Sequence, residues 1–471
     1  MKVNLNPFLM LALGVVLIVG THMTVSIGIL AWIAYAPFLL YLHQTSGWRS
    51  RLWFSLAYIL AWSVTVFKIV TDPIPFFVIP MYSIPIALFH LPAFLIWARF
   101  RGEKFAGLLF PALMIILEWI QYTFTPLGSW GAAAYTQMDH IVLLQSVSLF
   151  GLAGLGFLIY WVNTTAAYLI MDARMGLKRV LPPALTLLIV LSFGALRYDL
   201  SHSKGRPMIR VAAVGTDSEV GVGPLPSYEL RRQNAAILFA RTRMAAKEGP
   251  ELVVWNEAAA AVLPEEEPQW RDSLTALAAE CQVPLVAAYV ALLSEAPIRY
   301  ENKYLFIKPD GTIASTYFKH EPVPGEPAVK GTAPFEAHTI NHIKMAGAIC
   351  YDYDFPYIAK AFGKKEVDIV ALPASDWRGI DPIHTKMAAF RAVEQGHSIL
   401  RSTRFGLSAA ITPYGELVAQ MSSFDENDKI MLAHLPKAAS VSLYSLIGDV
   451  FVYLCMAFVF WFGIRTTGFQ L

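Results

Sequence analysis

The 471-residue sequence is short of charge: Lys, Arg, Asp and Glu make up 15% of it, whereas an ordinary soluble protein carries about 25%. This shortage argues against a chain that is soluble throughout. Cysteine is also scarce, and three cysteines cannot form a disulfide framework. The net charge is +2 and no basic run is present, so no nucleic-acid partner is expected.

The shortage of charge is uneven, and it divides the chain into three parts. Residues 1–196 hold 15 charged residues, residues 197–442 hold 55, and residues 443–471 hold two. Only the middle part has the charge density of a water-soluble domain. We therefore expect a transmembrane domain of about seven helices over residues 1–196, a soluble domain over 197–442, and a C-terminal transmembrane helix within 443–471.

Apolar stretches of spanning length recur through the first part and appear once more in the last. The predicted spans lie near residues 5–20, 24–42, 52–70, 76–98, 105–124, 145–171, 180–196 and 443–464. Basic residues gather in alternate loops, at 49–51, 99–104 and 174–179, and the positive-inside rule places these loops in the cytoplasm. With seven spans before it, the soluble domain is then predicted on the outer side of the membrane.

The fifth predicted span contains Glu118, a carboxyl within a membrane segment. Such a group is a candidate for function or for helix packing, and the sequence leaves both open. The loop that follows, residues 124–137, is uncharged and aromatic, and we expect it at the level of the lipid headgroups. Its Trp130 and Tyr135 have a plainer interpretation as ordinary interfacial aromatics.

In the middle part, short apolar runs alternate with amphipathic stretches, which predicts an α/β domain. The predicted strands are 209–214, 252–255, 285–290, 303–307, 343–349, 367–372, 398–403, 407–412 and 430–434. The predicted helices are 226–247, 269–281, 355–362 and 382–395. Pro309-Asp-Gly and Pro413-Tyr-Gly each predict a turn between two extended runs.

Three reactive residues, Glu257, Lys319 and Cys350, each follow an apolar run. Sites in α/β sheets form at the carboxyl ends of strands, so these three can converge. A cysteine nucleophile, a glutamate base and a lysine that stabilises an oxyanion together describe acyl transfer through a thioester. Each also has a plainer interpretation, because buried cysteines are common as small hydrophobes and charged residues at strand ends usually face water.

The residues around this trio resemble a known family. Val254–Glu257, Phe318–Glu326 and Ile349–Asp352 are similar to the three catalytic motifs of the nitrilase, or carbon-nitrogen hydrolase, superfamily, and the likeness covers 208–435. Seven spans before such a domain and one after it are typical of the bacterial apolipoprotein N-acyltransferase branch. The resemblance implies an integral membrane α-helical bundle of about eight spans plus an α/β nitrilase-like αββα sandwich.

It also implies a function. The family acts in the bacterial inner membrane, with its catalytic domain in the periplasm. The histidines do not cluster and Cys350 lacks a partner at ligand spacing, so no metal is expected, and no cofactor is expected either. The family moves an acyl chain from a phospholipid, usually phosphatidylethanolamine, to the N-terminal diacylglyceryl-cysteine of a lipoprotein. By motif, Cys350 would form the thioester, Glu257 would act as base, and Lys319 would stabilise the oxyanions.

Further residues are carried over from these motifs and from segments that continue the likeness, which are Leu372–Trp377, His384 and the outer loop around Trp130. The supporting candidates are Glu326, Asp352 and Tyr351, and the substrate or loop candidates are Trp130, Trp255, Trp377 and His384. Glu326 would hold Lys319 or Glu257 in place. The loops 320–340 and 375–385 join the motifs and contain Pro and Gly, which predicts lids.

The sequence departs from the family pattern in several places. Asn256 stands where the family usually has proline, Asp352 stands where it usually has glutamate, the lysine motif is one residue short at Pro324-Gly325, and 216–229 lacks a usual tryptophan. A membrane-tethered nitrilase-type hydrolase that uses water as acceptor is therefore a second hypothesis. A scaffold that only binds lipoproteins is a third, although a pure binder has no need of the full trio.

Overall fold

The computed structural model describes residues 6–171, 176–203, 205–216, 225–425, 429–437 and 441–467. The chain divides into two compact units. The first contains Met1–His202 and Ile447–Leu471, and the second contains Ser203–Leu446.

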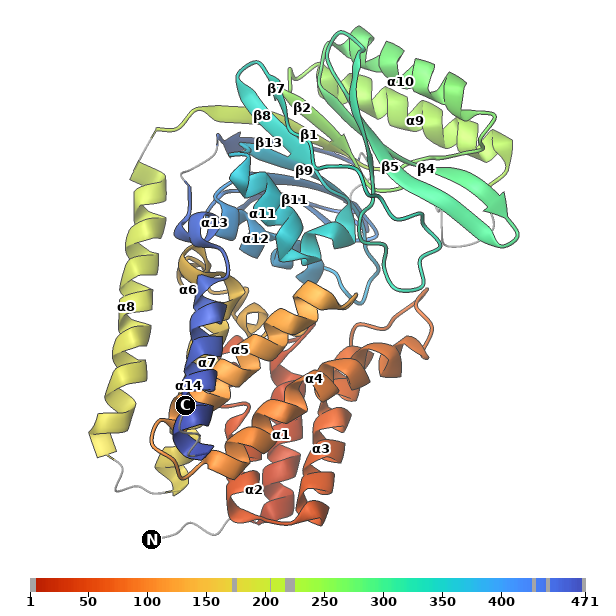
Figure 1. Cartoon of the computed structure of the whole chain (residues 1–471). Helices are drawn as coiled ribbons and strands as arrows, with labels where there is room; N and C mark the ends of the chain where they lie inside the picture. Colours follow the sequence, from red (N-terminus) through yellow and green to blue (C-terminus); the bar gives the residue numbers. More distant parts are fainter. Residues whose placement is uncertain are drawn as a thin grey trace. The chain divides into compact units, whose positions relative to one another are not determined.

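The first unit is built of helices (Figure 1). They are α1 (Pro7–Thr21), α2 (Ala36–Gln44), α3 (Trp48–Phe67), α4 (Val78–Phe100), α5 (Ala106–Phe124), α6 (Ile141–Leu144), α7 (Val147–Met171), α8 (Gly176–Ser203) and α14 (Val450–Thr467), with 3₁₀ turns at Gly28–Trp32 and Ala133–Gln137. Five of the described helices, α3, α4, α5, α7 and α8, are long and apolar enough to cross a membrane. Two more, α1 and α14, are apolar but shorter.

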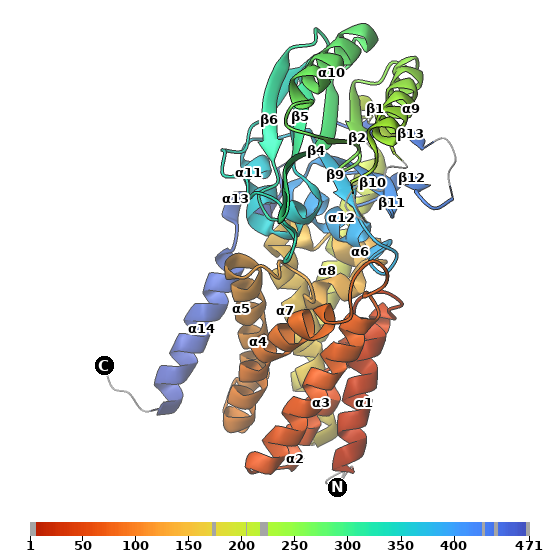
Figure 2. The same cartoon turned by 90° about the vertical axis from the view of Figure 1, so that its right-hand side faces the viewer.

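The helices of this unit pack in neighbouring pairs. Figure 2 shows α1 beside α3, and α5 packs against both α4 and α7. The start of α1 is fixed by Asn6, whose side-chain oxygen accepts the N–H of Phe8 at 2.9 Å, an N-cap that satisfies an otherwise orphaned donor. The 145–171 span is realised as α7, which is kinked at Phe150 and Gly151.

The predicted span over residues 24–42 is wrong, because this stretch is not one helix. Its only α-helix, α2, has nine residues, which makes about 14 Å against a hydrocarbon core of about 30 Å. The break is held by Asn163 of α7, whose Oδ1 accepts the N–H groups of Tyr35 and Ala36 at 2.7 and 3.2 Å. A side chain thus satisfies backbone donors that a continuous helix would satisfy itself.

Glu118 connects α5 to the 3₁₀ turn Ala133–Gln137 and to α7. Its Oε1 accepts the backbone N–H of Ala133 at 3.0 Å and the hydroxyl of Tyr160 on α7. The loop 124–137 is bound into the unit in the same way, since Gln121 Nε2 donates to the carbonyl of Trp130 at 2.8 Å, and the Trp130 side chain is buried. The structure therefore gives Glu118 a packing role, and Trp130 is a buried residue rather than an exposed interfacial aromatic.

The second unit contains two sheets. The first has the order β13-β1-β2-β4-β5-β6, with β3 paired to β4, and the second has the order β12-β11-β10-β9-β8-β7. The strands of the first sheet are β1 (Met208–Val214), β2 (Leu252–Trp255), β3 (Ala261–Val262), β4 (Leu285–Glu295), β5 (Ile298–Ile307), β6 (Ile313–Phe318) and β13 (Ile430–Pro436). Those of the second are β7 (His338–Ile340), β8 (Ile343–Gly347), β9 (Ile369–Ser375), β10 (Ser398–Arg404), β11 (Leu407–Ile411) and β12 (Leu417–Ser422).

Helices cover the outer faces of both sheets and make the domain an αββα sandwich. α9 (Tyr228–Ala246) and α10 (Glu267–Cys281) pack on the first sheet, as Figures 1 and 2 show. α11 (Pro356–Lys364) and α12 (Ile383–Gln395) cover the second sheet, and the short α13 (Leu443–Ile447) ends this unit. The predicted α/β nitrilase-like sandwich is confirmed.

Each predicted strand range overlaps an observed strand, but some observed strands were not predicted. The two predicted turns are present, between β5 and β6 and between β11 and β12. The predicted strand ranges do not include β3, β6, β7 or β12, although each predicted turn implied an extended run where β6 and β12 begin. The run 343–349 ends as a strand at Gly347, so the chain leaves the sheet three residues before Cys350.

Trp255 lies in the core of the first sheet rather than at a substrate surface. Its side chain is fully buried in the apolar cluster between this sheet and its helices, and its Nε1 donates to Thr242 Oγ1 of α9 at 2.9 Å. A buried indole usually finds such a partner for its N–H. Its place does not fit the prediction of a substrate contact.

Candidate active site

Cys350 opens a 3₁₀ turn, Cys350–Asp354, that follows β8. Its φ is +49°, a left-handed conformation that is costly for a residue with a side chain and is found mostly at functional sites. The thiol is buried, and its Sγ donates to the carbonyl of Ser375 at 3.5 Å. Burial and the charge of Glu257 raise the pKa of Cys350 well above its ordinary value, with Lys319 opposing them. The resting sulfur is therefore a protonated thiol that needs a base.

The carboxyl ends of strands from both sheets meet at this point. β8, β9 and β10 are mutually parallel, so Cys350 follows β8 at the same edge at which β9 ends in Ser375. Glu257 follows β2 of the other sheet, and its backbone N–H donates to the carbonyl of Ala374 in β9 at 3.3 Å. Parallel strands in both sheets thus bring distant segments to one edge.

Glu257 and Lys319 form a buried ion pair within a larger cluster. Lys319 Nζ donates to Glu257 Oε1 at 2.9 Å and to Glu326 Oε2 at 2.8 Å. Asn302 Nδ2 donates to Glu257 Oε1 at 2.7 Å and to Glu326 Oε1 at 3.0 Å. We call these four residues the acid–base cluster. In a low-dielectric site such charge-assisted hydrogen bonds are short and directional.

The charges of this cluster keep Lys319 and Glu326 ionised. Burial opposes the charge of Lys319, but Glu257 and Glu326 hold its pKa well above the ordinary value. Burial likewise opposes the charge of Glu326, and Lys319 outweighs it and lowers the pKa of this carboxyl. Lys319 is thus a fixed cation whose charge also acts on Cys350.

Asp352 connects the turn Cys350–Asp354, which we call the nucleophile turn, to the segment that follows Lys319. Its Oδ1 accepts the backbone N–H groups of His320 and Glu321 at 3.0 and 2.6 Å. Its Oδ2 accepts from Tyr317 OH at 2.9 Å and from the N–H of Ile349 at 3.0 Å. Burial, opposed by these bonds, raises the pKa of Asp352 to about 7. Asp352 is one methylene shorter than the glutamate that is usual in the family, and it still reaches both segments.

The other predicted site residues lie outside this cluster. Tyr351 is buried in the nucleophile turn, with its ring edge-on to Phe355 at a centroid distance of 5.3 Å. Trp377 follows β9 and is partly exposed, and its carbonyl accepts the N–H of Ile380 at 3.0 Å. Their roles at a substrate remain predictions.

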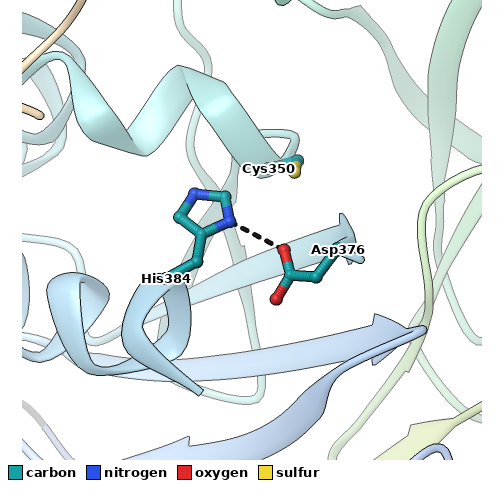
Figure 3. Close-up of side chains that lie close together, drawn as sticks. All are labelled: Cys350, Asp376 and His384. Carbon is teal, nitrogen blue, oxygen red and sulfur yellow. Dashed lines mark hydrogen bonds and ion pairs between the residues drawn. The ribbon is translucent and has the colours of Figure 1, made fainter. Parts of the chain in front are cut away.

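His384 belongs to a second buried ion cluster beside Cys350 (Figure 3). From α12, its Nδ1 lies 2.7 Å from Asp376 Oδ1 and its Nε2 lies 3.2 Å from Asp354 Oδ2. A guanidinium nitrogen of Arg401 in β10 donates to both oxygens of Asp376, at 2.7 and 2.9 Å. We call Asp354, Asp376, His384 and Arg401 the framework cluster. Burial opposes a charged imidazole, but Asp354 and Asp376 outweigh it and raise the pKa of His384 to about 9.

Cys350, Asp376 and His384 also have the composition of a metal site, since their ligand atoms lie within 4.8 Å of one another. However, the oxygens of Asp376 already accept from Arg401, and both ring nitrogens of His384 face carboxylates. A metal ion would have to displace a guanidinium and discharge an imidazolium. The donor set does not fit a resident metal.

Sequence reasoning missed Asn302, Asp354, Asp376 and Arg401. Asn302 lies within β5, where nothing in the spacing marks it, and its role appears only when β5 pairs with β6 and places it beside Lys319. Asp376 stands in the segment Leu372–Trp377 that supported the family resemblance, so that motif was the available signal. A buried, ionised side chain cannot be recognised before its partner is placed.

The arrangement has the parts for acyl transfer. A buried thiol lies under the influence of a carboxylate that can take its proton and an ammonium that can stabilise an oxyanion. The carboxylate and the ammonium are joined directly and held by Glu326 and Asn302.

Comparisons with known proteins bear on both units. Residues 13–165 match the apolipoprotein N-acyltransferase N-terminal domain family, and residues 210–442 match the carbon-nitrogen hydrolase family. The chain is 26% identical to the apolipoprotein N-acyltransferase of Geobacter metallireducens, over 96% of this chain and 94% of that one. It is 24% identical to the protein of the same name from Borreliella burgdorferi, over 72% and 71%.

Solved structures are similar to about half of the chain. An amidase from Nesterenkonia sp. is 17% identical over 53% of this chain and 97% of that chain, with a TM-score of 0.42. A carbon-nitrogen hydrolase from Helicobacter pylori G27 is 17% identical over 53% and 94%, also with a TM-score of 0.42.

Proposed function

Because this chain belongs to the apolipoprotein N-acyltransferase family as a divergent member, we propose that it transfers a fatty acyl chain from a membrane phospholipid to the N-terminal diacylglyceryl-cysteine of a lipoprotein. The observation that carries the proposal is the buried Cys350 thiol beside the joined Glu257 and Lys319 side chains. The apolar helices of this multi-pass membrane protein suit substrates that are themselves anchored in lipid.

The lipid donor, the membrane and the side on which the catalytic domain lies are proposed from the family resemblance and from the charges of the loops. The proposed donor is phosphatidylethanolamine, and the proposed location is the bacterial inner membrane. Basic residues at 49–51, 99–104 and 174–179 support cytoplasmic loops there. The catalytic domain would then lie on the periplasmic side.

In the first half-reaction, Glu257 takes the proton of the Cys350 thiol as the sulfur attacks the ester carbonyl of the donor. A sulfur–carbon bond forms, and the electron pair of the carbonyl moves to oxygen, where the Lys319 ammonium stabilises it. When the intermediate collapses, the ester carbon–oxygen bond breaks. Glu257 returns its proton to the leaving oxygen, which releases a lysophospholipid and leaves an acyl thioester on Cys350.

In the second half-reaction, the neutral amino group of the lipoprotein attacks the thioester carbonyl. Glu257 accepts a proton from this amine, and Lys319 again stabilises the oxyanion. The carbon–sulfur bond breaks, and the sulfur takes the proton back from Glu257. The products are an amide and the free thiol, and the two separate half-reactions predict ping-pong kinetics.

The supporting residues would keep this machinery in place. Glu326 and Asn302 hold Lys319 and Glu257 at fixed positions, and Asp352 fixes the segment after Lys319 against the nucleophile turn. The loops 320–340 and 375–385 are proposed as lids that move between fixed points, since Glu326, Asp376 and His384 are held in the two clusters. Excluding water is essential, since hydrolysis of the thioester would waste the acyl group.

A membrane-tethered amidase or hydrolase is the alternative, because the same trio serves it with water as the acceptor. The match of residues 210–442 to the carbon-nitrogen hydrolase family supports this hydrolase alternative. The two functions differ in what discharges the thioester, so the test must include both acceptors.

The test is intact mass spectrometry of the purified protein after incubation with phosphatidylethanolamine. We expect an added acyl mass on the wild type and on C281A, and none on C350A. Cys281, at the end of α10, is the matched control cysteine. A diacylated lipopeptide should remove the adduct rapidly and water slowly. Rapid loss to water alone would favour the hydrolase, and no adduct on folded wild type would overturn the proposal.

A further inference from the structure

Asn302 lies on β5 and bridges the two carboxylates of the acid–base cluster. Its side chain is buried, and its backbone carbonyl accepts the N–H of Lys319 at 2.8 Å. Its Nδ2 donates to Oε1 of Glu257 at 2.7 Å and to Oε1 of Glu326 at 3.0 Å. An amide nitrogen has two hydrogens, so one is given to each carboxylate.

The charges around this amide set its orientation. Its Oδ1 is buried and has no hydrogen-bond partner among the described residues, although leaving a buried acceptor without a partner is costly. Turning the amide end for end would aim Oδ1 at the carboxylates of Glu257 and Glu326 and remove both bonds. Asn302 is therefore held in the orientation in which it is a donor to both.

Glu326 is fully occupied by donors. Its Oε1 accepts from Asn302 at 3.0 Å and from the hydroxyl of Tyr300 at 3.3 Å. Its Oε2 accepts from Lys319 at 2.8 Å and from the backbone N–H of Val323 at 2.9 Å. A carboxylate has about four acceptor positions, so this residue has none left for a proton.

Glu257 is occupied at one oxygen only. Lys319 and Asn302 both donate to its Oε1, at 2.9 and 2.7 Å. Within the part of the chain that the structure describes, no donor reaches its Oε2. The distribution of donors thus distinguishes two carboxylates that share the same lysine, and it leaves one oxygen open to a proton.

We propose that Asn302 is a positioning residue that reserves Oε2 of Glu257 as the atom which takes the thiol proton. The inference rests on the proposed function and assigns its proton transfer to one atom. In that step the S–H bond of Cys350 breaks, an O–H bond forms at Oε2, and the electron pair stays on sulfur for the attack on the donor ester.

The same amide keeps two like charges apart. Neighbouring carboxylates without a donor between them tend to share a proton, whereas hydrogen bonds to the charged form favour that form. Asn302 should therefore keep Glu257 unprotonated, and able to act as base, at lower pH than the cluster would allow without it.

Other charged and titratable groups also act on Glu257, and they remain when Asn302 is replaced. They are Lys319 and Glu326 from the segment after β6, Tyr300 from β5, Cys350 from the nucleophile turn, and Arg404 from β10. Because these groups are common to wild type and the variants, a changed pH dependence reports on the amide.

The experiment measures thioester formation on Cys350 by intact mass, with phosphatidylethanolamine as donor, from about pH 4.5 to 8.5, where a buried carboxyl titrates. N302L has nearly the size of asparagine without its donors. Its rate should fall about 10- to 100-fold at the acidic end, the range for a lost hydrogen bond to a charged group. It should return to within about threefold of wild type at the alkaline end, where the base is ionised in both proteins.

Three further variants sharpen the comparison. N302D keeps the shape but adds a third carboxylate beside Lys319, so its acidic limb should move further to higher pH. E326Q removes a neighbouring negative charge, and its limb should move to lower pH. N302Q keeps an amide and should recover part of the rate lost at the acidic end. If N302L does not fold, N302D against N302Q carries the same test.

N163L is the matched control for loss of a buried asparagine. Asn163 accepts backbone N–H groups in the first unit, so its replacement should lower the thermal midpoint and leave the acidic limb in place. E257Q should lose the limb altogether. A limb that persists in E257Q belongs to another group and would contradict the assignment.

Equal slowing of folded N302L at every pH would give Asn302 a structural role only and overturn the inference. An unchanged limb, or one that moves to lower pH, would do the same. If folded wild type forms no acyl adduct, the proposed function fails, and alkylation of Cys350 by iodoacetamide then supplies the pH profile, with C350A as blank. In that measurement a limb at higher pH in N302L supports the role of Asn302, and an undisplaced limb excludes it.

Discussion

The two ion clusters beside Cys350 are built on opposite principles. The acid–base cluster has one cation, Lys319, between two carboxylates, whereas the framework cluster matches two carboxylates with His384 and Arg401. A surplus of negative charge leaves a carboxylate that can accept a proton. The framework cluster has as many cations as carboxylates, so it has no carboxylate ready to accept a proton, and it holds secondary-structure elements together.

The clusters also differ in where their members come from. The acid–base cluster is supplied by the first sheet and by the segments after its strands. The framework cluster is supplied by the nucleophile turn, the residue that follows β9, α12 and β10. The difference teaches that burial and charge do not by themselves mark a catalytic group. Breaking the first cluster should therefore stop the chemistry, and breaking the second should mainly weaken the fold.

The largest effect is expected from E257Q. The amide keeps the size and the hydrogen bonds of the side chain but cannot take the thiol proton, so thioester formation should slow about 10²- to 10⁴-fold. Intact mass against time measures this rate. E326Q is the control, since Glu326 contacts the same lysine, and it should lose less. Loading of folded E257Q at the wild-type rate would show that Glu257 is not the base.

K319M should have the next largest effect. Removing the stabilising cation should slow loading about 10²- to 10³-fold, and leaving two buried carboxylates facing each other should cost about 3–5 kcal/mol of stability. K303M separates the two effects, because Lys303 is equally buried between Glu267 and Glu301 but away from Cys350. Equal loss of loading in both folded variants would contradict an oxyanion role.

D376N tests the framework cluster. It removes the carboxylate between His384 and Arg401, so the thermal midpoint in detergent should fall by the equivalent of about 3–5 kcal/mol. Loading by the folded fraction should stay within about tenfold of wild type. If folded D376N instead loads as slowly as E257Q, the distinction between the clusters fails.

The smallest effect concerns pH. The folded pKa of His384, about 9, lies above its ordinary value of 6.5, so its contribution to stability is complete below pH 6.5 and is lost as pH rises through 9. The thermal midpoint of wild type should therefore fall between pH 6.5 and 9.5 more steeply than that of H384Q. Parallel curves for the two proteins would show that His384 is not held as a cation.

Secondary structure was predicted from the sequence more accurately in the second unit than in the first. In the second unit, alternating runs and turn signals predicted most strands and all four major helices, because each pattern is local. In the first unit, hydropathy predicted a span at 24–42 where Asn163 supports a broken chain instead. A side chain 128 residues away decides that break, and no window of hydropathy can include it.

The site shows the same division. Glu257, Lys319 and Cys350 were predicted as strand-end residues and by their motifs, and the sequence alone determined that a thiol, a carboxylate and an ammonium occur there. Only the tertiary structure decided that Glu326 shares Lys319 with Glu257, that Asn302 donates to both of these carboxylates, and that Trp255 packs in the core. Sequence determines which groups are available and which segments extend, because those depend on neighbours along the chain. Partners, burial and hence charge state depend on neighbours in space, which only the packed sheets supply.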